Sequence, residues 1–448
     1  MAIKSRILSK LKSAYVTMNM AATAHPQKLH PVLHNLEEAR DLCQQGMTGS
    51  NYAQYGEVYD GLIMAVKQII SGEAGRDTEE IVRLCKDLLE HIVMETRREE
   101  HFKKEIVFLP YKASMWDSME SVWQAAVDDS ENVVPYVVVI PYCDRDPEGG
   151  VREWHCEAAE FPQYVSVVDY RNVDLEEMHP DVIVIQNPYD NYNFVTSVAT
   201  KYYSRYLKEY TDKLVYIPYF VLEEPDLDDE ESLEGIAHFL FHGEGVRNAH
   251  LTIVQSENMR EAYIRLLVKY TNKDRLYWEK RILGLGSPKF DKVLSTKRED
   301  IRLPESWRRI IEKKDGTRKK VILYNVSLAG LLEYKEILLD KMEWVFQTFY
   351  ERQDEIALLW RPHPLFEATI KSKVPEIGAR YQKMIERYRS EGWGIYDDSP
   401  DLHRAIAVSD GYYGGESSLV ELFQSAGKPV MLMLQNVELR EPLFEESV

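Results

Sequence analysis

Hydrophobic residues recur at helical spacing through the first 100 residues of the chain. Between Ile81 and Val93, apolar side chains stand three or four positions apart, with charged residues between them. This spacing places the apolar side chains on one face of a helix. We therefore predict a helical N-terminal module over residues 1–100.

The first predicted helix, over residues 3–15, is both amphipathic and basic. Its apolar stripe consists of Ile3, Ile7, Leu8, Leu11 and Tyr15, whereas Arg6, Lys10 and Lys12 lie mostly off the stripe. One interpretation is a peripheral contact with anionic lipid, to which each basic residue adds about 1 kcal/mol. The alternative is a helix that packs on the N-terminal module, because most amphipathic helices cover a protein core.

From Glu105 onward the pattern changes to short apolar runs separated by segments of helix length. The first series covers residues 106–109, 136–140, 164–168, 182–185, 214–217 and 251–254. A charged link at 297–319 precedes a second series at 321–324, 356–360, 393–396, 405–408 and 429–434, with a long amphipathic helix at 334–352. Short apolar runs of this kind are typical of strands that are buried on both faces of a parallel sheet.

Strands that alternate with helices in two successive sets indicate an α/β protein with two doubly wound parallel-sheet domains. We expect these two domains to face a cleft. The predicted boundaries are 1–100 for the helical module, 101–296 for an N-terminal Rossmann-like domain on the acceptor side, and 297–448 for a C-terminal Rossmann-like domain that binds a nucleotide donor.

Charge and composition narrow the classes of partner. The 448 residues include 55 Lys and Arg against 74 Asp and Glu, a formal net charge of −19, which argues against a nucleic-acid partner. An anionic nucleotide would therefore be bound locally, by helix N-termini and a few basic groups. The four cysteines have neither metal-ligand nor disulfide spacing, which favours a reduced, cytoplasmic setting. No apolar run approaches the roughly 18 residues needed to span a bilayer.

Loops that follow strands are the first places to look for a ligand site. Gly284 to Asp291 follows the first series, and its Ser287 and Lys289 can contact an anionic group. An ordinary interdomain turn explains the same segment equally well.

A second loop follows the strand run at 356–360 and contains Arg361 and His363 between prolines. The guanidinium of Arg361 has the geometry to bind a phosphate with two hydrogen bonds. His363 can donate to a diphosphate or protonate a departing nucleotide. A structural histidine in a tight turn is the alternative.

A third loop leads from a glycine pair into two serines that open a helix. The free N–H groups of a helix start, with the hydroxyls of Ser417 and Ser418, would form an anion site beside Gly415. Glu416 is suited to accept hydrogen bonds from ribose hydroxyls. Alternatively, one of the two serines is a plain N-cap.

A fourth loop contains Asp398 and Ser399. It could border the base pocket, but we favour a structural role in which one of these two residues caps the helix that includes His403.

Three segments of the C-terminal half resemble the CDP-glycerol glycerophosphotransferases of teichoic-acid synthesis. Residues 286–291 are similar to that family's Gly-x-Pro-Arg-x-Asp segment, and residues 361–364 to its His-Pro loop. Ser409 and Asp410, followed by Glu416 to Ser418, are similar to its Ser-Asp…Asp-Tyr-Ser-Ser element with a shortened spacing. The resemblance covers about residues 214–434 and is specific in the C-terminal half and weak before it.

The resemblance implies a GT-B fold, a CDP-linked donor between the domains, no metal requirement and no cofactor other than the donor as substrate. It places His363, Ser417 and Ser418 at the donor's phosphates and adds Asp410 to the donor site. The chain departs from the family at its general-base histidine, because the matching place, residues 215–220, contains no histidine.

Two residues are candidates for the missing base. His242 lies in a glycine-bearing loop, and it would have to move toward the cleft to act; a solvent-exposed loop histidine is the alternative. Asp190 follows the run at 182–185 and can activate a hydroxyl, although Asn-Pro-Tyr-Asp is also good turn chemistry.

The function expected from the sequence is transfer of glycerol-phosphate, or a related polyol-phosphate, from a CDP-linked donor to a hydroxyl of a cell-surface glycan or lipid-linked precursor. The protein would work in the cytoplasm or at the inner face of the cell membrane. A glycosyltransferase that uses a nucleotide sugar, and an inactive nucleotide-binding scaffold, are the two alternatives. A homo-oligomer is left open.

Overall fold

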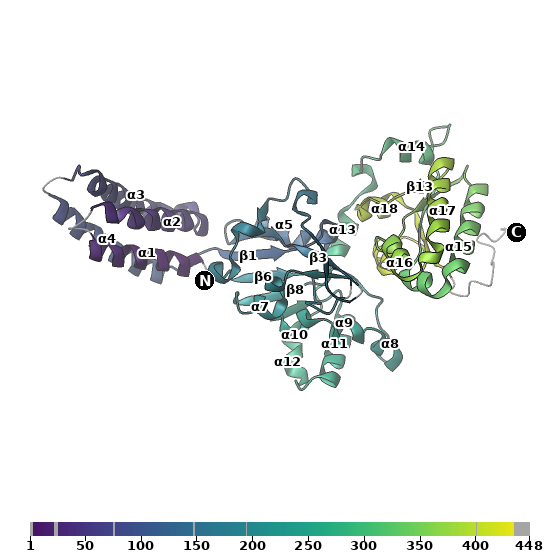
Figure 1. Cartoon of the computed structure of the whole chain (residues 1–448), viewed down its shortest axis with the longest axis horizontal. Helices are drawn as coiled ribbons and strands as arrows, with labels where there is room; N and C mark the ends of the chain where they lie inside the picture. Colours follow the sequence, from purple (N-terminus) through teal and green to yellow (C-terminus); the bar gives the residue numbers. More distant parts are fainter. Residues whose placement is uncertain are drawn as a thin grey trace. The chain divides into compact units, whose positions relative to one another are not determined.

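The structure is a computed structural model that describes residues 3–21, 26–74, 77–146, 148–193, 195–399 and 401–433 (Figure 1). Leu434, the last residue of the run predicted at 429–434, lies outside the described residues. The chain divides into two compact units. Unit 1 comprises residues 1–219 and 225–286, and unit 2 comprises residues 220–224 and 287–448.

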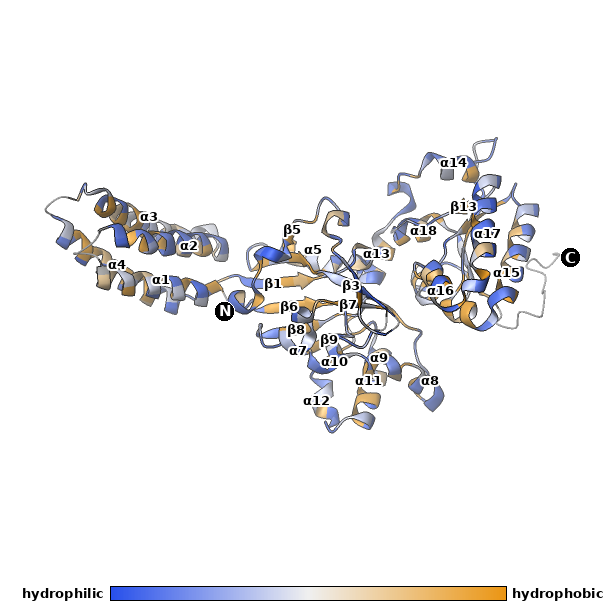
Figure 2. Cartoon of the chain, in the orientation of Figure 1, coloured by the Kyte–Doolittle hydropathy of each residue, from blue (hydrophilic) through white to orange (hydrophobic). Residues whose placement is uncertain are grey.

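The N-terminal part of unit 1 is a bundle of four helices. These are α1 (Ile3–Ala21), α2 (His30–Gly46), α3 (Gly49–Ser71) and α4 (Thr78–Arg98), with a short 3-10 helix, η1 (Pro26–Leu29), before α2. Each helix packs on the next, and α4 returns to pack on α1. The apolar positions of all four helices, orange in Figure 2, supply one continuous core, so the region predicted as helical is helical.

The apolar stripe of α1 faces the bundle core. Ile3, Ile7 and Leu11 are each 0–1% exposed. Two of the three basic residues beside the stripe have acidic partners: Arg6 pairs with Glu105, and Lys10 with Glu38 at 2.7 Å. The stripe is therefore not available to lipid, and the structure favours the packed helix over the predicted membrane contact. Within the described residues, none of the helices is both long enough and apolar enough to span a membrane.

The second part of unit 1 is built on a seven-stranded parallel sheet. Its strands are β1 (Lys104–Leu109), β2 (Val133–Val139), β5 (Val167–Asp169), β6 (Val182–Ile185), β8 (Lys213–Tyr216), β9 (Leu251–Ile253) and β10 (Ile282–Leu283), in the order β10-β9-β8-β6-β1-β2-β5. The chain starts in the middle, winds to one edge and then crosses to the other side, which is the strand order of a Rossmann fold. Five of the six predicted runs overlap these strands over most of their length, and the run at 164–168 contributes only its last two residues.

Helices and a small second sheet surround this parallel sheet. The helices are α5 (Glu120–Asp128), α6 (Leu175–Met178), α7 (Ser204–Leu207), α8 (Glu230–Gly235), α9 (Ala237–Phe241), α10 (Glu244–Asn248), α11 (Glu257–Tyr270) and α12 (Arg275–Glu279). The small sheet is antiparallel, with β3 (Tyr142–Arg145) between β4 (Val151–His155) and β7 (Thr196–Val198). The sequence pattern did not predict this sheet, because its strands are short and β4 is largely exposed.

Unit 2 contains a five-stranded parallel sheet with the same winding. Its strands are β11 (Lys320–Asn325), β12 (Ile356–Trp360), β13 (Ile395–Tyr396), β14 (Gly411–Gly414) and β15 (Val430–Leu432), in the order β13-β12-β11-β14-β15. Two doubly wound α/β domains and an N-terminal helical module are the parts that the sequence predicts for a GT-B-like fold. The structure confirms each of these three parts, taken separately.

One predicted strand of unit 2 is wrong. Residues 405–408 belong to the buried helix α18 (Leu402–Val408), and the fourth strand is β14, whose four residues are all buried. Asp401 caps α18 by accepting from the Arg404 amide at 2.9 Å, so neither Asp398 nor Ser399 is the cap. A four-residue apolar run is compatible with either a buried helix or a buried strand.

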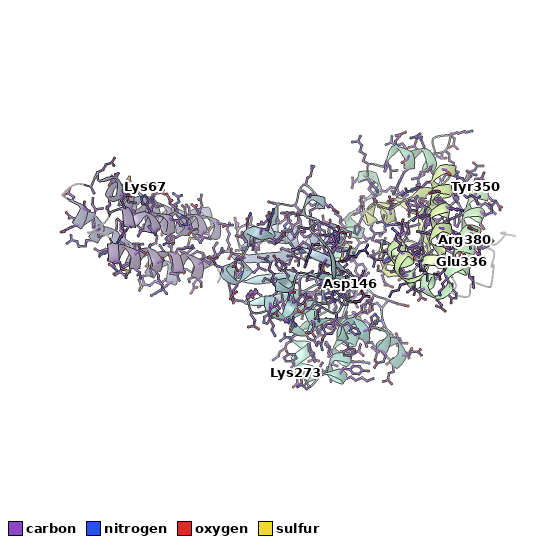
Figure 3. All side chains as sticks on the ribbon, in the orientation of Figure 1. Lys67, Asp146, Lys273, Glu336, Tyr350 and Arg380 are labelled. Atoms are coloured by element: carbon purple, nitrogen blue, oxygen red, sulfur yellow. The ribbon has the colours of Figure 1, made fainter. Side chains whose placement is uncertain are left out.

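The remaining helices of unit 2 cover its sheet. They are α13 (Pro288–Ser295), α14 (Glu305–Ile311), α15 (Leu328–Glu351), α16 (Phe366–Lys373), α17 (Gly378–Glu391) and α19 (Ser418–Ser425). The helix predicted at 334–352 is α15, which begins earlier and has a non-helical residue, Lys335, inside it. Arg380 of α17 pairs with Glu336 and Asp340 of α15 at 2.7 and 2.6 Å, which joins the two helices (Figure 3).

Candidate functional site

The winding of the unit 2 sheet defines the place where a ligand of such a fold binds. The chain order reverses at β11, which lies between β12 and β14. In open α/β sheets, ligands bind at the carboxyl ends of the strands beside this reversal point. The loops after β11, β12 and β14 therefore build the candidate site.

The loop after β14 ends in the start of α19. Ser417 is the N-cap of this helix, and its oxygen accepts from the Leu419 amide at 3.3 Å. Ser418 and Glu416 are exposed, whereas Ser417 is half-buried. The first turn of a helix presents N–H groups without intrahelical partners and carries positive partial charge. The structure thus confirms the plain N-cap, at Ser417, and the anion site at this helix start stays a prediction.

The two glycines before Glu416 allow this loop to approach the loop after β11. A Cβ atom at Gly414 would lie 2.0 Å from the carbonyl oxygen of Asn325. At Gly415 it would lie 3.1 Å from the hydroxyl and 3.2 Å from the amide nitrogen of Ser327. The Gly415 amide also donates to the Asn325 carbonyl at 3.1 Å. These glycines are required by the close backbone contact at the reversal point.

Asn325 and Ser327 are site residues that the sequence analysis missed. Asn325 ends β11 and donates from its side chain to the Arg361 carbonyl at 2.7 Å. Ser327 caps α15 by accepting from the Gly330 amide at 3.2 Å. Two features of the sequence could have identified them: Asn325 is a polar residue directly after the apolar run at 321–324, and Ser327 is a serine at the start of the next helix.

Arg361 lies at this edge, but its guanidinium bonds to the protein. The residue is 7% exposed, and its two terminal nitrogens donate to the Asp397 carboxylate and, at 2.7 Å, to the Ser399 carbonyl. The arginine therefore ties the loop after β12 to the loop after β13. This geometry differs from the predicted fork onto a phosphate.

His363 is half-buried in the same loop. Its Nδ1 accepts from the Leu365 amide at 3.1 Å, and burial lowers the pKa of the imidazole below its ordinary value. The bond to Nδ1 requires the neutral tautomer with its proton on Nε2. His363 thus carries an Nε2–H donor in the loop after β12, and its contact with a phosphate stays a prediction.

Ser287 and Lys289 lie at the start of the main segment of unit 2. They do not belong to the loops that follow its strands. Ser287 caps α13 and accepts from the Lys289 amide at 3.4 Å, and both residues are buried. Helix α13 packs on α18 and α19. Lys289 is 6% exposed, so its ammonium does not form an open surface for an anion.

Asp410 lies at the opposite edge of the sheet. It precedes β14 and accepts from the Val321 amide at 2.8 Å, at the amino end of β11. Its carboxylate also accepts from the guanidinium groups of Arg298 and Arg318. The structure therefore does not bring Asp410 together with Ser417 and His363, and its contacts hold strand starts in place.

The two predicted base candidates of unit 1 differ in exposure. Asp190 is 2% exposed, and its two carboxylate oxygens accept from the amide and hydroxyl of Ser204 at 2.8 and 2.9 Å. This is a structural capping contact, which leaves no open side for a substrate hydroxyl. His242 is exposed at the end of α9, with its ring 6.3 Å from that of Tyr192, in agreement with the alternative of a loop histidine.

The reversal point of the unit 1 sheet lies between β1 and β6. Gln186, directly after β6, is fully buried and accepts from the Ser118 hydroxyl at 2.9 Å. Its amide nitrogen has no hydrogen-bond partner in the described structure. An unpartnered buried amide costs about 1–3 kcal/mol.

Tyrosines surround this second edge. Tyr111 follows β1, Tyr189 follows β6 and Tyr219 follows β8. The Tyr219 hydroxyl hydrogen-bonds to those of Tyr111 and Tyr189. Burial raises the pKa of all three phenols, so none of them can take a proton near neutral pH.

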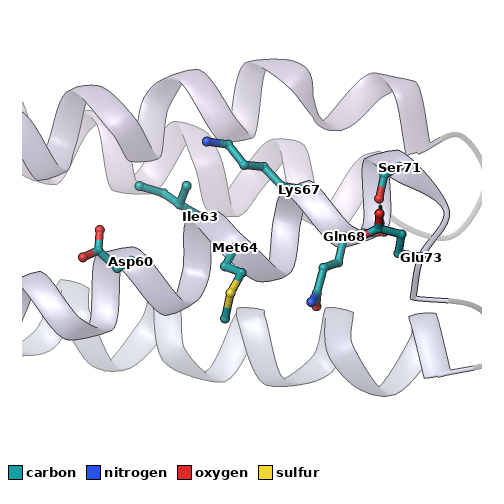
Figure 4. A pocket seen from close by; sticks show the side chains of 7 residues that line it. All are labelled: Asp60, Ile63, Met64, Lys67, Gln68, Ser71 and Glu73. Atoms are coloured by element: carbon teal, nitrogen blue, oxygen red, sulfur yellow. Dashed lines mark hydrogen bonds between the residues drawn. The ribbon is translucent and has the colours of Figure 1, made fainter.

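Neither the surface of the bundle nor a cluster of metal-ligating side chains offers a second site among the described residues. A shallow depression on the bundle is lined by Asp60, Ile63, Met64, Lys67, Gln68, Ser71 and Glu73 (Figure 4). Its one lysine lies 3.0 Å from Glu37, so the depression has no excess of positive charge for an anion. The described residues contain no group of three or more His, Cys, Asp or Glu side chains that could hold a metal ion.

Neither the family models nor the curated proteins include a match to this sequence. Among solved structures, the chain is similar to UDP-GlcNAc 2-epimerase from Methanocaldococcus jannaschii, with 11% identity, a TM-score of 0.43, and coverage of 75% of this chain and 90% of that one. It is also similar to the wall teichoic acid polymerase TagF, with 15% identity, a TM-score of 0.40, and coverage of 84% and 78%. Because these scores are low, the fold assignment rests on the strand order of the two sheets.

Proposed function

We propose that the protein is a transferase that moves glycerol-phosphate, or a related polyol-phosphate, from a CDP-linked donor to a hydroxyl of a cell-surface glycan or lipid-linked precursor. The observation that carries this proposal is the start of α19 beside the reversal point of the unit 2 sheet. The sequence resemblance in the segments around Arg361 and Ser417 supports the choice of donor.

The start of α19 suits a diphosphate. Ser418 is exposed at the first helical position, and the N–H groups of the first turn favour a negative charge. In a chain of net charge −19, such a local site is needed to offset the general repulsion of an anion. His363 adds an Nε2–H donor from the neighbouring loop.

The reaction needs a nucleophile and a stabilised leaving group. The acceptor hydroxyl oxygen attacks the phosphorus that carries the glycerol, the bond from that phosphorus to the bridging oxygen breaks, and CMP leaves with the electron pair. Donors aimed at the departing phosphate lower the barrier because charge develops there in the transition state. In this proposal, His363 and the first turn of α19 have that role.

Two alternative functions would use the same site. A glycosyltransferase would bind a nucleotide sugar there, and the missing family histidine in residues 215–220 favours this alternative. A scaffold would bind the nucleotide without turnover. Thermal unfolding with CDP-glycerol, CMP and UDP-GlcNAc separates the two transferases, because a ligand at about 100 times its dissociation constant adds about 2.7 kcal/mol to stability. Donor binding without hydrolysis or transfer to any acceptor would identify the scaffold.

The site itself is tested with Ser418→Glu. A carboxylate at the first helical position stabilises the helix but repels a phosphate, so we expect a folded protein that no longer binds CDP-glycerol in calorimetric titrations. Gln424→Glu is the matched control, because it adds the same charge to the exposed face of α19 about 9 Å away. Equal affinity of wild type and Ser418→Glu would refute the site.

A further inference from the structure

The charged segment before the second series of strands is strongly basic. Residues 302–320 contain eight Lys and Arg against three Asp and Glu, a net charge of +5 in a chain whose net charge is −19. In the structure the segment contains α14 and the turn that leads into β11, and all of it belongs to unit 2. The proposed donor site does not use these charges.

Helix α14 directs its apolar and its basic side chains to opposite sides. Trp307 and Ile311, which stand four positions apart, are buried in the core of unit 2. Arg308 and Arg309 are exposed on the same helix, and Arg302 is exposed just before it. The helix therefore covers the core with one side and presents guanidinium groups on the other.

A closed turn holds the lysines that follow α14. The Lys319 amide donates to the Ile311 carbonyl at 2.8 Å, and the Lys313 amide donates to the Thr317 carbonyl at 2.7 Å. Lys314 is exposed inside this turn. These lysine side chains therefore extend from a backbone that hydrogen bonds keep in place.

Most of these cations have no carboxylate partner. The guanidinium of Arg308 lies 3.8 Å from the carboxylates of Glu305 and Glu312. Arg318 pairs with Asp410. Among the described residues, no carboxylate forms an ion pair with the other six, which are Arg302, Arg309, Lys313, Lys314, Lys319 and Lys320. Like charges that lie close together repel one another, so an anionic partner would stabilise them.

These six residues and Arg308 are called the basic surface below. Its turn lies at the amino end of β11, away from the proposed donor site. Lys320 is the first residue of β11 and Asn325 is the last, and five steps along a strand span about 16 Å. Asn325 adjoins the loops of the donor site. A partner at the turn would therefore leave the donor site open.

The basic surface presents charge without large apolar side chains. Exposed large apolar residues occur elsewhere in the chain, but none lies between residues 302 and 320. Binding at this surface would therefore be electrostatic, without side chains that enter an apolar layer. Clusters of about four to eight Lys and Arg are typical of segments that bind anionic lipid.

We propose that the basic surface of unit 2 binds the headgroups of an anionic lipid bilayer. The choice of a lipid surface over a soluble polyanion rests on the proposed function, because its acceptors include a lipid-linked precursor. The ammonium and guanidinium groups lie against the headgroup phosphates and offset the repulsion between the membrane and a chain of net charge −19.

The test is co-sedimentation of the full chain with vesicles of phosphatidylcholine, either alone or mixed with phosphatidylglycerol. We expect binding to the mixed vesicles only. Binding should be lost as NaCl is raised from about 0.1 M to about 1 M, because the screening length falls from about 10 Å to about 3 Å. A variant with Arg309→Gln, Lys313→Gln and Lys314→Gln should bind about 100-fold more weakly, since each basic residue near an anionic surface raises the affinity about fivefold.

The matched control is a variant with Lys371→Gln, Lys373→Gln and Lys383→Gln. It removes the same number of positive charges from exposed positions of α16 and α17 and should bind the mixed vesicles as the wild type does. Urea unfolding checks that both triple variants are folded. Lys314→Glu alone, which should also weaken binding, replaces the first variant if that variant is not folded.

Three results would overturn the proposal: no binding of the wild type to mixed vesicles, equal binding to both kinds of vesicle, or equal affinity of the two triple variants. A wild type that ignores vesicles but binds soluble polyphosphate through these residues would assign the surface to a soluble polyanion instead. Calorimetric titration with CDP-glycerol should give the same affinity for the wild type and both triple variants. A wild type that binds mixed vesicles but no CDP-glycerol would refute the proposed function and leave the basic surface as a lipid site.

Discussion

At the scale of single residues, burial decides what a charged or titratable side chain can do. Arg361 is a residue that the sequence selects as a phosphate ligand, but 93% of its surface is covered, and Asp397 and Ser399 take its donors. Removing one partner of a buried ion pair leaves the other charge without compensation. The arginine is therefore needed for the fold of this edge.

We expect Arg361→Met to lower the free energy of unfolding by about 3–5 kcal/mol. Arg387→Met is the control, since Arg387 pairs with Glu391 on the surface, with 70% of its side chain exposed, and such pairs contribute about 0–1 kcal/mol. Urea unfolding measures both values. Similar small losses in the two variants would show that the buried pair does not hold the loops.

The buried imidazole of His250 leads to a prediction of how the stability of the fold depends on pH. Burial lowers the pKa of its imidazole, and its Nδ1 must be unprotonated to accept from the Leu214 amide. The folded state therefore binds fewer protons than the unfolded state, so stability is fully present above pH 6.5 and is lost as the pH falls below that value. We expect urea midpoints to drop between pH 7 and pH 5.

His250→Asn is the informative variant for this effect, because an amide oxygen accepts the same hydrogen bond and does not titrate. The part of the pH dependence that belongs to His250 should disappear in it. A midpoint that changes with pH equally in both proteins would assign the effect to other groups.

At the scale of elements, the cap of α19 has two roles that can be separated. Ser417→Ala removes the oxygen that accepts from the Leu419 amide, which should cost about 1 kcal/mol of stability. The same change opens the first turn to disorder, so CDP-glycerol should bind more weakly. Differential scanning calorimetry and titration calorimetry measure the two effects.

Ser256→Ala is the matched control for Ser417→Ala. Ser256 caps α11 in unit 1 and accepts from the Met259 amide at 2.9 Å, so its loss should cost a similar stability without changing donor affinity. Equal weakening of CDP-glycerol binding in the two variants would mean that the start of α19 has no special role.

The elements also show what the sequence could and could not predict. Strands such as β1, β6 and β12 have uninterrupted apolar runs, and their places followed from the pattern. The run at 405–408 is equally apolar and proved to be a helix, because a run of four residues carries no information on period. The β3–β4 hairpin has no uninterrupted apolar run, and β4 is exposed from Val151 to Trp154, so the pattern did not predict it.

At the scale of the whole molecule, a buried polar cluster joins the helical bundle to the sheet of unit 1. Arg6 of α1 pairs with Glu105 of β1, which is fully buried. The Tyr136 hydroxyl donates to Glu105 at 3.2 Å and accepts from Gln45 of α2 at 2.6 Å. Two helices of the bundle and two strands of the sheet thus share one hydrogen-bond network.

We expect Arg6→Met to lower the free energy of unfolding by about 3–5 kcal/mol, because Glu105 would remain charged and buried. Lys10→Met on the same helix removes a more exposed pair with Glu38 and should cost about 0–1 kcal/mol. Hydrogen exchange of the β1 amides should rise only in the Arg6 variant. Unchanged exchange there would show that the bundle and sheet are stabilised independently.

The central claim is that the first turn of α19 binds the phosphates of a nucleotide-linked donor. Diffraction from crystals of the full chain soaked with CMP tests it most directly. We expect density for the phosphate within hydrogen-bond distance of the first amides of α19 and the Ser418 hydroxyl. Ordered CMP at any other place, with water at the start of α19, would contradict it.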